Sequence, residues 1–352
     1  METPLIESHR AAGAHVAEYD GCALPASFAT LEREYAAGKQ TVALFDTSWH
    51  ATLKLAGRDR VKYLHAITSN NIEALGTGAG AFALLLNPQG HILSELEIYL
   101  LAESVLVRTH ASARERTVAT LKKFVIASDV KIEDTTDRTG SIAIEGPRAA
   151  SVVERACGAR LEELAAMAIR DVAVEGIACQ MVRRSYFGRP GAEIIAAREC
   201  IAPLWQLLLA AVRALGGEPI GTAALNALRL EASVPWYPAD FSEAMIPHEA
   251  AVETTHISFN KGCYTGQEIV ERVRSRGHVN RKRVSLKFST AAPPAIGTKL
   301  RENGTGAEVG FVSSAAASPN LQPAIGMGYV RREQFAPGSV VEFDGGTATV
   351  IG

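Results

Sequence analysis

A cysteine set between two glycines and close to a lysine is the first candidate for chemistry in this chain. It lies in the octapeptide Lys261-Gly262-Cys263-Tyr264-Thr265-Gly266-Gln267-Glu268. Thr265 and Glu268 have the spacing of a capping box, and the apolar positions that follow predict a helix. The positive end of that helix and Lys261 would both favour a thiolate on Cys263. A reactive or ligand-facing Cys263 and an inert cysteine beside a helix cap fit these residues equally well.

An acid at the end of a glycine-containing turn is the second candidate. Tyr186, Gly188, Gly191 and Glu193 predict a strand, a tight turn and another strand. A carboxylate such as Glu193 can accept two parallel hydrogen bonds. Taken alone, the pattern is more typical of a hairpin that carries a surface glutamate.

Several single residues could contribute to the same or another site. Arg229 lies on a predicted helix, and Glu95 lies on the strand that follows the turn at 87–90. Trp49 and Trp236 could stack on a planar ring, although a core position is the commoner role for Trp49. A basic cluster between 272 and 283 fits a solvated helix end, or contact with an acidic partner or RNA; the lack of interleaved aromatic residues makes RNA the least favoured. Its members are Arg272, Arg274, Arg276, His278, Arg281, Lys282 and Arg283.

The elements that must position these residues fall into two recognisable patterns. Residues 51–137 predict the order β-α-ββ-β-α-β, which is typical of a ferredoxin-like α+β subdomain. Residues 281–352 contain short alternating runs separated by Gly, Pro, Asn and Ser, which predict a small β-barrel. We therefore place one domain boundary near residue 280, with a region 1–280 before it.

Composition excludes some classes of function. The 352 residues are enough for two or three domains, and the net charge of −2 gives no general attraction to nucleic acid or membrane. The five cysteines are scattered without a CxxC pair, so neither a disulfide framework nor a metal site is predicted. The N-terminus lacks the apolar core of a signal peptide, and the run 204–215 is too short to span a bilayer. We expect a cytoplasmic protein in a reducing compartment.

The octapeptide resembles the signature of the YgfZ family of folate-binding proteins, within the superfamily of the glycine cleavage T protein, an aminomethyltransferase. Thr3-Pro4-Leu5, His9, Leu24-Pro25, Phe45-Asp46 and Ser48 stand where T proteins carry matching residues. The resemblance implies an α+β, T-protein-like folate-binding fold with a ferredoxin-like insertion and a C-terminal barrel. It implies tetrahydrofolate or a one-carbon-substituted folate as the cofactor.

The resemblance also implies roles for individual residues. Matched to the family pattern, Glu193 would bind the two-donor edge of the pterin and Tyr186 would line the pocket. Arg229 would face the folate, with pairing to the protein's own acids as the alternative. Trp49 and Trp236 are further candidates for ligand contact, and the basic cluster could hold a polyglutamate tail.

One departure from the T-protein pattern separates two hypotheses. The family's Ile-Leu-Asp-Asp-Leu reads Ile-Leu-Ser94-Glu95-Leu here, so Glu95 keeps a carboxylate but adds a methylene. Under the first hypothesis the protein binds folate and supports iron–sulfur cluster assembly or repair, with Cys263 as the essential thiol and iron–sulfur client or assembly proteins as partners. The alternative is a tetrahydrofolate-dependent aminomethyl- or methyltransferase, with Glu95 in the catalytic role and Cys263 incidental.

Overall fold

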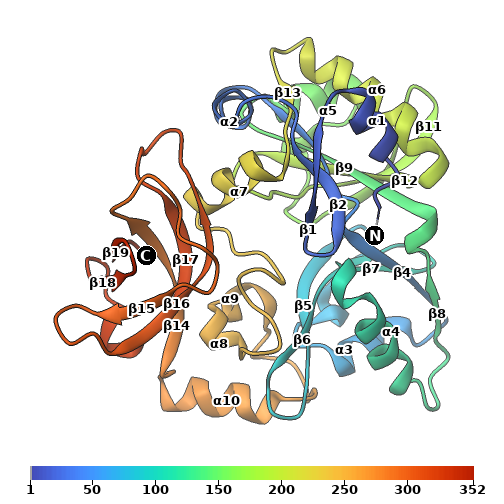
Figure 1. Ribbon diagram of the computed structural model, residues 1–352. Helices are drawn as coiled ribbons and strands as arrows, with labels where there is room; N and C mark the ends of the chain where they lie inside the picture. Colours follow the sequence, from blue (N-terminus) through green and yellow to red (C-terminus); the bar gives the residue numbers. More distant parts are fainter. Residues whose placement is uncertain (1) are drawn as a thin grey trace.

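The computed structural model describes residues 2–352, and its largest sheet has the order β10-β11-β12-β9-β3-β13 (Figure 1). All of its neighbouring strands are antiparallel except β13 and β3. Ile201, Leu204 and Trp205 of α6 are fully buried against this sheet, which explains the apolar run seen in the sequence. The elements are β3 (Ala43–Asp46), β9 (Thr139–Glu145), α5 (Ala149–Cys157), β10 (Ile169–Val174), β11 (Ile177–Val182), β12 (Gly191–Ala197), α6 (Arg198–Arg213) and β13 (Glu218–Pro219).

The segment inserted between β3 and β9 forms a second sheet with the order β5-β6-β7-β4-β8. Its chain order is β4, α3, β5, β6, β7, α4 and β8, as the sequence predicted. The apolar face packs Leu53, Ile98 and Val107 against Leu64 of α3 and Leu121 of α4. The elements are β4 (His50–Ala56), α3 (Arg60–Ile67), β5 (Gly80–Leu86), β6 (Ile92–Leu100), β7 (Val105–His110), α4 (Arg114–Lys123) and β8 (Lys131–Asp134).

The C-terminal strands close into a barrel with the order β14-β17-β16-β15-β18-β19. The α+β class with a ferredoxin-like insertion and a C-terminal barrel is therefore confirmed. The sequence-based prediction missed β15, because among its four residues only Leu300 is fully buried and no alternation is visible. The strands are β14 (Arg281–Phe288), β15 (Lys299–Glu302), β16 (Glu308–Ala316), β17 (Ile325–Arg331), β18 (Val340–Phe343) and β19 (Gly346–Val350).

The remaining elements lie beside the large sheet or run between the three units. The chain from α7 to α10 runs between the insertion and the barrel, and α7 packs on β16 and β17 (Figure 1). Within residues 2–352, no helix is long and apolar enough to cross a membrane. These elements are α1 (Ile6–Ala11), β1 (His15–Tyr19), β2 (Cys22–Ser27), α2 (Leu31–Gln40), α7 (Thr222–Glu231), α8 (Pro247–Ala250), α9 (Glu253–His256) and α10 (Gln267–Arg276). Short 3-10 turns cover Ile72–Ala74, Ala111–Ala113, Thr136–Arg138, Leu161–Glu163 and Arg332–Gln334.

The start of α10 differs from the prediction. The N-cap is Gly266, which has φ +83° and makes no side-chain cap hydrogen bond, so Thr265 and Glu268 do not form a capping box. Glycine is required here because a Cβ atom would lie 2.6 Å from the carbonyl oxygen of Asn87, in the turn between β5 and β6. The motif therefore turns tightly against this hairpin before the helix begins.

Candidate functional site

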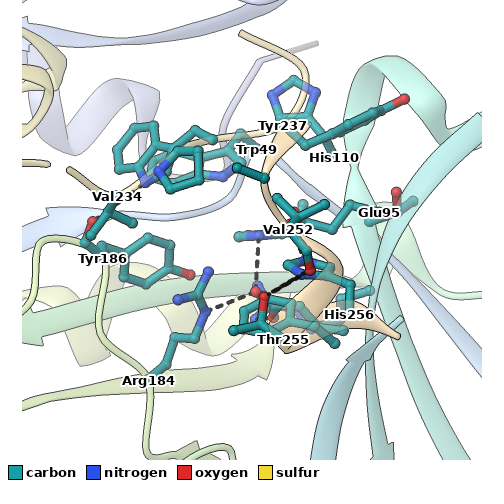
Figure 2. Close-up of a pocket in the computed structure, with 18 of the residues that line it drawn as sticks. Trp49, Glu95, His110, Arg184, Tyr186, Val234, Tyr237, Val252, Thr255 and His256 are labelled. Carbon is teal, nitrogen blue, oxygen red and sulfur yellow. Dashed lines mark hydrogen bonds and ion pairs between the residues drawn. The ribbon is translucent and has the colours of Figure 1, made fainter. Parts of the chain in front are cut away.

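A cavity of about 320 Å³ opens where the three units meet (Figure 2). Strands β4, β6 and β7 of the insertion form one wall, and 184–186 beside the large sheet form another. The segments 233–237 and 251–256 and Arg283 at the start of the barrel complete it. A concave site at the junction of domains, lined by aromatic and polar groups, is the usual form of a small-molecule pocket.

Three aromatic residues that the sequence singled out meet in this pocket. The ring centroids of Trp49 and Trp236 are 5.8 Å apart, and those of Trp49 and Tyr186 are 5.9 Å apart at nearly right angles. The Trp236 Nε1–H donates to the Tyr186 carbonyl oxygen at 3.3 Å, which holds the indole in place. The Arg184 guanidinium lies 4.5 Å from the Tyr186 ring centroid. These faces can contact a flat ligand ring.

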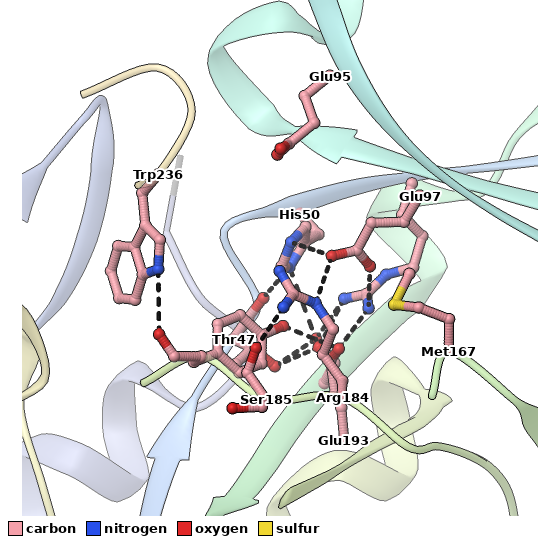
Figure 3. Close-up of polar contacts among 12 residues, drawn as sticks. Thr47, His50, Glu95, Glu97, Met167, Arg184, Ser185, Glu193 and Trp236 are labelled. Atoms are coloured by element: carbon pink, nitrogen blue, oxygen red, sulfur yellow. Dashed lines mark hydrogen bonds and ion pairs between the residues drawn. The ribbon is translucent and has the colours of Figure 1, made fainter. Parts of the chain in front are cut away.

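Glu193 occupies the floor beneath the pocket, and its partners come from this chain (Figure 3). Its two oxygens accept hydrogen bonds from the Arg108 guanidinium at 2.6 and 2.7 Å, and it also accepts from Thr47 at 2.6 Å and from the Tyr186 hydroxyl at 2.9 Å. Burial alone would raise the pKa of Glu193, but Arg108 outweighs that effect and holds the pKa well below its usual range.

The direct contact predicted between Glu193 and a pterin edge does not fit this arrangement. Glu193 is fully buried and does not line the pocket, whereas Arg108 does. Its acceptor capacity is used by Arg108, Thr47 and Tyr186, so the carboxylate positions two pocket-lining side chains. In this structure Glu193 therefore supports the pocket from beneath by fixing Arg108 and Tyr186.

Glu97 is the nearly buried carboxylate that does line the pocket. It accepts from Arg184 at 2.9 Å and from the Tyr99 hydroxyl at 2.9 Å, and Arg108 lies 3.5 Å away (Figure 3). Burial raises the pKa of Glu97, but the positive charges near it, Arg184 first among them, lower the pKa by a larger amount. The pKa of Glu97 therefore lies below the ordinary value of a glutamate. Sequence analysis missed Glu97, although residues two apart on a strand share a face and Glu95 was already a candidate.

Glu95 lies at the pocket wall beside a histidine from α9 (Figure 2). Its Oε1 is 2.8 Å from His256 Nε2, and within residues 2–352 no group donates to its other oxygen. The His256 ring is fixed by stacking on Phe82 at 4.8 Å and by contacts of Nδ1 with the Val252 carbonyl at 3.2 Å and the Thr255 hydroxyl at 2.7 Å. The Glu95 carboxylate is thus fixed by His256 through one oxygen, and its other oxygen has no donor in the described chain.

His110 supplies a hydrogen-bond donor that sequence analysis did not find. The backbone N–H of Ser112 donates to His110 Nδ1 at 3.2 Å, so the neutral ring carries its proton on Nε2. Nε2 is buried, and no residue in the described chain partners it. Burial lowers the pKa of His110 to about 3, with His50 adding to the effect. The residue lines the pocket, so this buried N–H lies beside the cavity without a partner in the described chain.

Arg229 does not take the predicted position facing a ligand. It is buried, forms an ion pair with Asp240 and donates from Nε to the Asn226 amide oxygen at 2.8 Å. Arg229 therefore pairs with one of the protein's own acids, Asp240, as the alternative prediction stated. Arg283 of β14 lines the pocket instead, and within residues 2–352 it has no carboxylate at ion-pair distance. Burial lowers the pKa of Arg283.

The octapeptide lies apart from this pocket, because none of its residues contributes to the lining. Lys261 Nζ donates to the carbonyl oxygens of His65 and Thr68, and burial lowers its pKa to about 8. Tyr264 is buried in an apolar cluster with Phe241. Gln267 and Glu268 form the first turn of α10, next to Gly266. Cys263 is the exposed one of the chain's five cysteines, and the structure does not bring it together with Glu95.

The fold, with a pocket where its three units meet, has the T-protein architecture, and matches to two family models show the family. Residues 5–261 match the GCVT N-terminal domain and residues 281–350 match the glycine cleavage T-protein C-terminal barrel domain. The chain therefore belongs to the GCVT family. The YgfZ resemblance within that family stays a prediction.

Relatives and a solved structure cover nearly the whole chain. It is 29% identical over 344 residues to an aminomethyltransferase of Geobacillus kaustophilus, covering 97% of this chain and 93% of that one. It is 26% identical over 344 residues to an aminomethyltransferase of Bacillus subtilis, covering 97% and 94%. The glycine cleavage system aminomethyltransferase T from Bartonella henselae superposes with a TM-score of 0.91 at 26% identity, covering 100% of this chain and 97% of that chain.

Proposed function

We propose that the pocket binds a tetrahydrofolate and that the protein is a folate-dependent one-carbon transferase of the aminomethyltransferase type. The observation that carries the proposal is the held carboxylate of Glu95, at the wall of a pocket with aromatic faces. The full-length relatives named aminomethyltransferase support the same activity. The one-carbon-substituted form of tetrahydrofolate would be the other state of the cofactor in this pocket.

The polar groups of the pocket fit such a ligand. Trp49, Tyr186 and Trp236 would contact its flat rings, and Glu97 would accept from donors on the pterin edge. His110 Nε2–H, which has no partner in the described chain, would donate to a ring oxygen or nitrogen. The cationic group of Arg283 would face the carboxylates of the glutamate moiety.

As a folate amine forms its bond to the one-carbon unit, the bond between that unit and its donor breaks, and the donor leaves with the electron pair. Glu95 would take up the proton that the amine loses and return it to the leaving donor group. Its free oxygen is the acceptor, and His256 holds the other oxygen so that the carboxylate stays in one orientation. Proton transfer to a positioned side chain contributes roughly 100- to 10,000-fold to rate. Since Glu95 is one methylene longer than an aspartate, its fixed hydrogen bond to His256 is what would preserve the geometry.

A second candidate function is folate-linked support of iron–sulfur cluster assembly or repair, as in YgfZ-like proteins. The exposure of Cys263 on the octapeptide, away from the pocket, favours it. On this proposal the thiol would meet an iron–sulfur client or assembly protein while the pocket holds folate. Glu95 would then contribute to binding alone.

The two candidates are separated with two variants and their matched controls. Glu95→Gln is compared with Glu103→Gln, an exposed glutamate beyond the end of β6, and Cys263→Ser with Cys200→Ser. Tetrahydrofolate binding is measured from the change in fluorescence of Trp49 and Trp236. Aminomethyl transfer is measured from the formation of the substituted folate. Iron–sulfur enzyme activity is measured in a host that lacks its own YgfZ-like protein.

Each outcome assigns a role. Transfer that falls at least about 100-fold in Glu95→Gln and is unchanged in Cys263→Ser supports the transferase. Rescue of the host that needs Cys263 and tolerates Glu95→Gln, with no transfer in vitro, supports the iron–sulfur role. A wild-type protein that shows no saturable tetrahydrofolate binding would refute both.

A further inference from the structure

The segment that begins at Trp236 and ends at Asp240 is tied to all three units of the protein. Trp236 and Tyr237 line the pocket, whereas Asp240 lies outside the lining. The Trp236 indole donates to the carbonyl oxygen of Tyr186, beside the large sheet, at 3.3 Å. The Tyr237 hydroxyl donates to the carbonyl oxygen of Leu93, in β6 of the insertion, at 3.1 Å. The third tie runs from Asp240 to the barrel, and neither proposed function uses it.

Asp240 is fully buried, and both of its carboxylate oxygens are bound within this chain. Oδ2 accepts from the backbone N–H of Trp236 at 3.0 Å and forms the ion pair with Arg229. Oδ1 accepts from the hydroxyl of Ser313, on barrel strand β16, at 2.9 Å. The backbone carbonyl oxygen of Asp240 accepts from the hydroxyl of Tyr329, on β17, at 2.8 Å. Asp240 therefore joins a wall of the pocket to two strands of the barrel.

A β-bulge directs Ser313 toward Asp240. The pairing of β16 with β17 shifts register between Val312 and Ser314, so Ser313 is the extra residue of the bulge. A bulge interrupts the alternation of a strand and re-aims a side chain. Val312 packs in the apolar core of the barrel, while the Ser313 hydroxyl reaches Asp240. The irregularity in β16 thus falls at the residue that contacts the pocket segment.

The Asp240 carboxylate also fixes the ring of Trp236. The Arg229 guanidinium lies 5.3 Å from the centroid of the Trp236 ring, and the ion pair with Asp240 holds that guanidinium in place. A cation over the face of an indole is attracted by its π electrons. Asp240 therefore acts on the backbone of Trp236 directly and on its ring through Arg229.

A shift of this segment would also reach the side chain that the transferase proposal uses as a base. Tyr237 directly follows Trp236 and lines the pocket together with Glu95 (Figure 2). Burial raises the pKa of the Tyr237 hydroxyl, and the negative charge of Glu95 adds to that effect, so the two groups are close enough to interact. The hydroxyl is bound to the carbonyl of Leu93, two residues before Glu95 on β6.

We propose that Asp240 is a positioning residue through which the barrel sets the aromatic wall of the pocket. Ser313 and Tyr329 are its contacts on the barrel. The proposal rests on the pocket being the ligand site proposed above. Because buried side chains are closely packed and shift together, a displacement of β16 or β17 would be passed through Asp240 to Trp236. The barrel then contributes to ligand affinity through more than Arg283, which lines the pocket directly.

A mild variant of the full-length protein tests this role. Replacing Asp240 itself would leave the buried charge of Arg229 without its partner and destabilise the whole fold. Ser313→Ala instead removes one hydrogen bond to the Asp240 carboxylate. Its matched control is Ser314→Ala, the same change at the next residue, which is also buried and makes no hydrogen bond to Asp240 in the described chain.

A second variant removes the other contact from the barrel. Tyr329→Phe deletes the hydroxyl that donates to the carbonyl oxygen of Asp240. Its matched control is Tyr63→Phe, which deletes a buried hydroxyl that donates to the carbonyl oxygen of Leu121 within the insertion. Both changes therefore remove one buried bond from a tyrosine to a backbone carbonyl, and only the first acts on the pocket segment.

Two quantities are measured, and the first needs no folate. Trp236 is 9% exposed, so we expect both barrel variants to increase the quenching of its fluorescence by acrylamide. This increase should disappear when the same changes are made in a Trp236→Phe background. The second quantity is the dissociation constant of tetrahydrofolate, measured well below the melting temperature of each variant. We expect Ser313→Ala and Tyr329→Phe to weaken binding about 2- to 10-fold, the range of one hydrogen bond, and the controls to match wild type.

Stronger quenching of Trp236 together with weaker binding, in the barrel variants alone, supports the proposal. Equal changes in the variants and their controls overturn it, because they would reflect a general loss of packing. Unchanged quenching in both barrel variants overturns it, and so does stronger quenching with wild-type affinity. If the wild-type protein does not bind tetrahydrofolate, the proposed function fails, while the quenching result still decides whether the barrel positions Trp236.

Discussion

Replacing Glu193 with glutamine breaks the buried ion pair beneath the pocket, and we expect a large loss of stability. Glu193 lies on β12 of the large sheet, whereas Arg108 lies on β7 of the insertion, so the pair joins two units. Both side chains are almost fully buried, and an amide would turn a donor toward the Arg108 guanidinium. Removing one partner of a buried ion pair costs about 3–5 kcal/mol.

The magnitude can be checked by thermal unfolding. With an unfolding entropy of about 2.1 cal/mol/K per residue, each kcal/mol shifts the Tm of this 352-residue chain by about 1.4 °C, so Glu193→Gln should melt about 4–7 °C below wild type. Glu308→Gln is the matched control, because it makes the same change in an exposed pair with Lys299 and should cost under about 1 kcal/mol. A melting temperature within about 2 °C of wild type for Glu193→Gln would refute the supporting role.

The loss of stability in Glu193→Gln should also depend on pH. Arg108 lowers the pKa of Glu193 in the folded state, so this contribution to stability is complete above the ordinary glutamate pKa, about 4.3, and is lost as pH falls below it. The difference in Tm between wild type and Glu193→Gln should therefore narrow from pH 5 to pH 3. A difference that stays constant over this range would show that the charge of Glu193 is not the source of the effect.

Two further predictions test the octapeptide and the pocket histidine. Gly266→Ala should lower Tm by several degrees more than Gly277→Ala, because both have positive φ but only the first would place a Cβ atom 2.6 Å from Asn87 O; equal losses would refute the packing of the motif on the hairpin. For His110, whose folded pKa is about 3 against an unfolded value of about 6.5, stability should fall by about 2 kcal/mol as pH drops from 7 to 5, because the unfolded chain takes up the proton. His110→Gln should remove this part of the pH dependence of Tm, and an unchanged dependence would contradict the neutral, buried ring.

The sequence predicted the elements whose patterns are local. The alternating runs of the barrel and the order of strands and helices in 51–137 follow from periodicities of two and 3.6 residues, which any short window displays. The strand β15 was missed because four residues with one fully buried side chain carry no such signal. The aromatic candidates Trp49, Tyr186 and Trp236 do line one pocket, although nothing local showed that they would meet.

Only the tertiary structure decided which charges pair and which remain for a ligand. Arg108 and Glu193 are 85 positions apart, and Glu95 and His256 are 161 apart, so no local pattern could relate them. A buried charge without a partner is costly, and a carboxylate therefore pairs with the cation that the fold brings nearest. That is why Glu193 and Arg229, which looked like ligand contacts in the sequence, are held by Arg108 and Asp240, while Glu95 and Arg283 line the pocket and Glu97 lines it in an ion pair with Arg184.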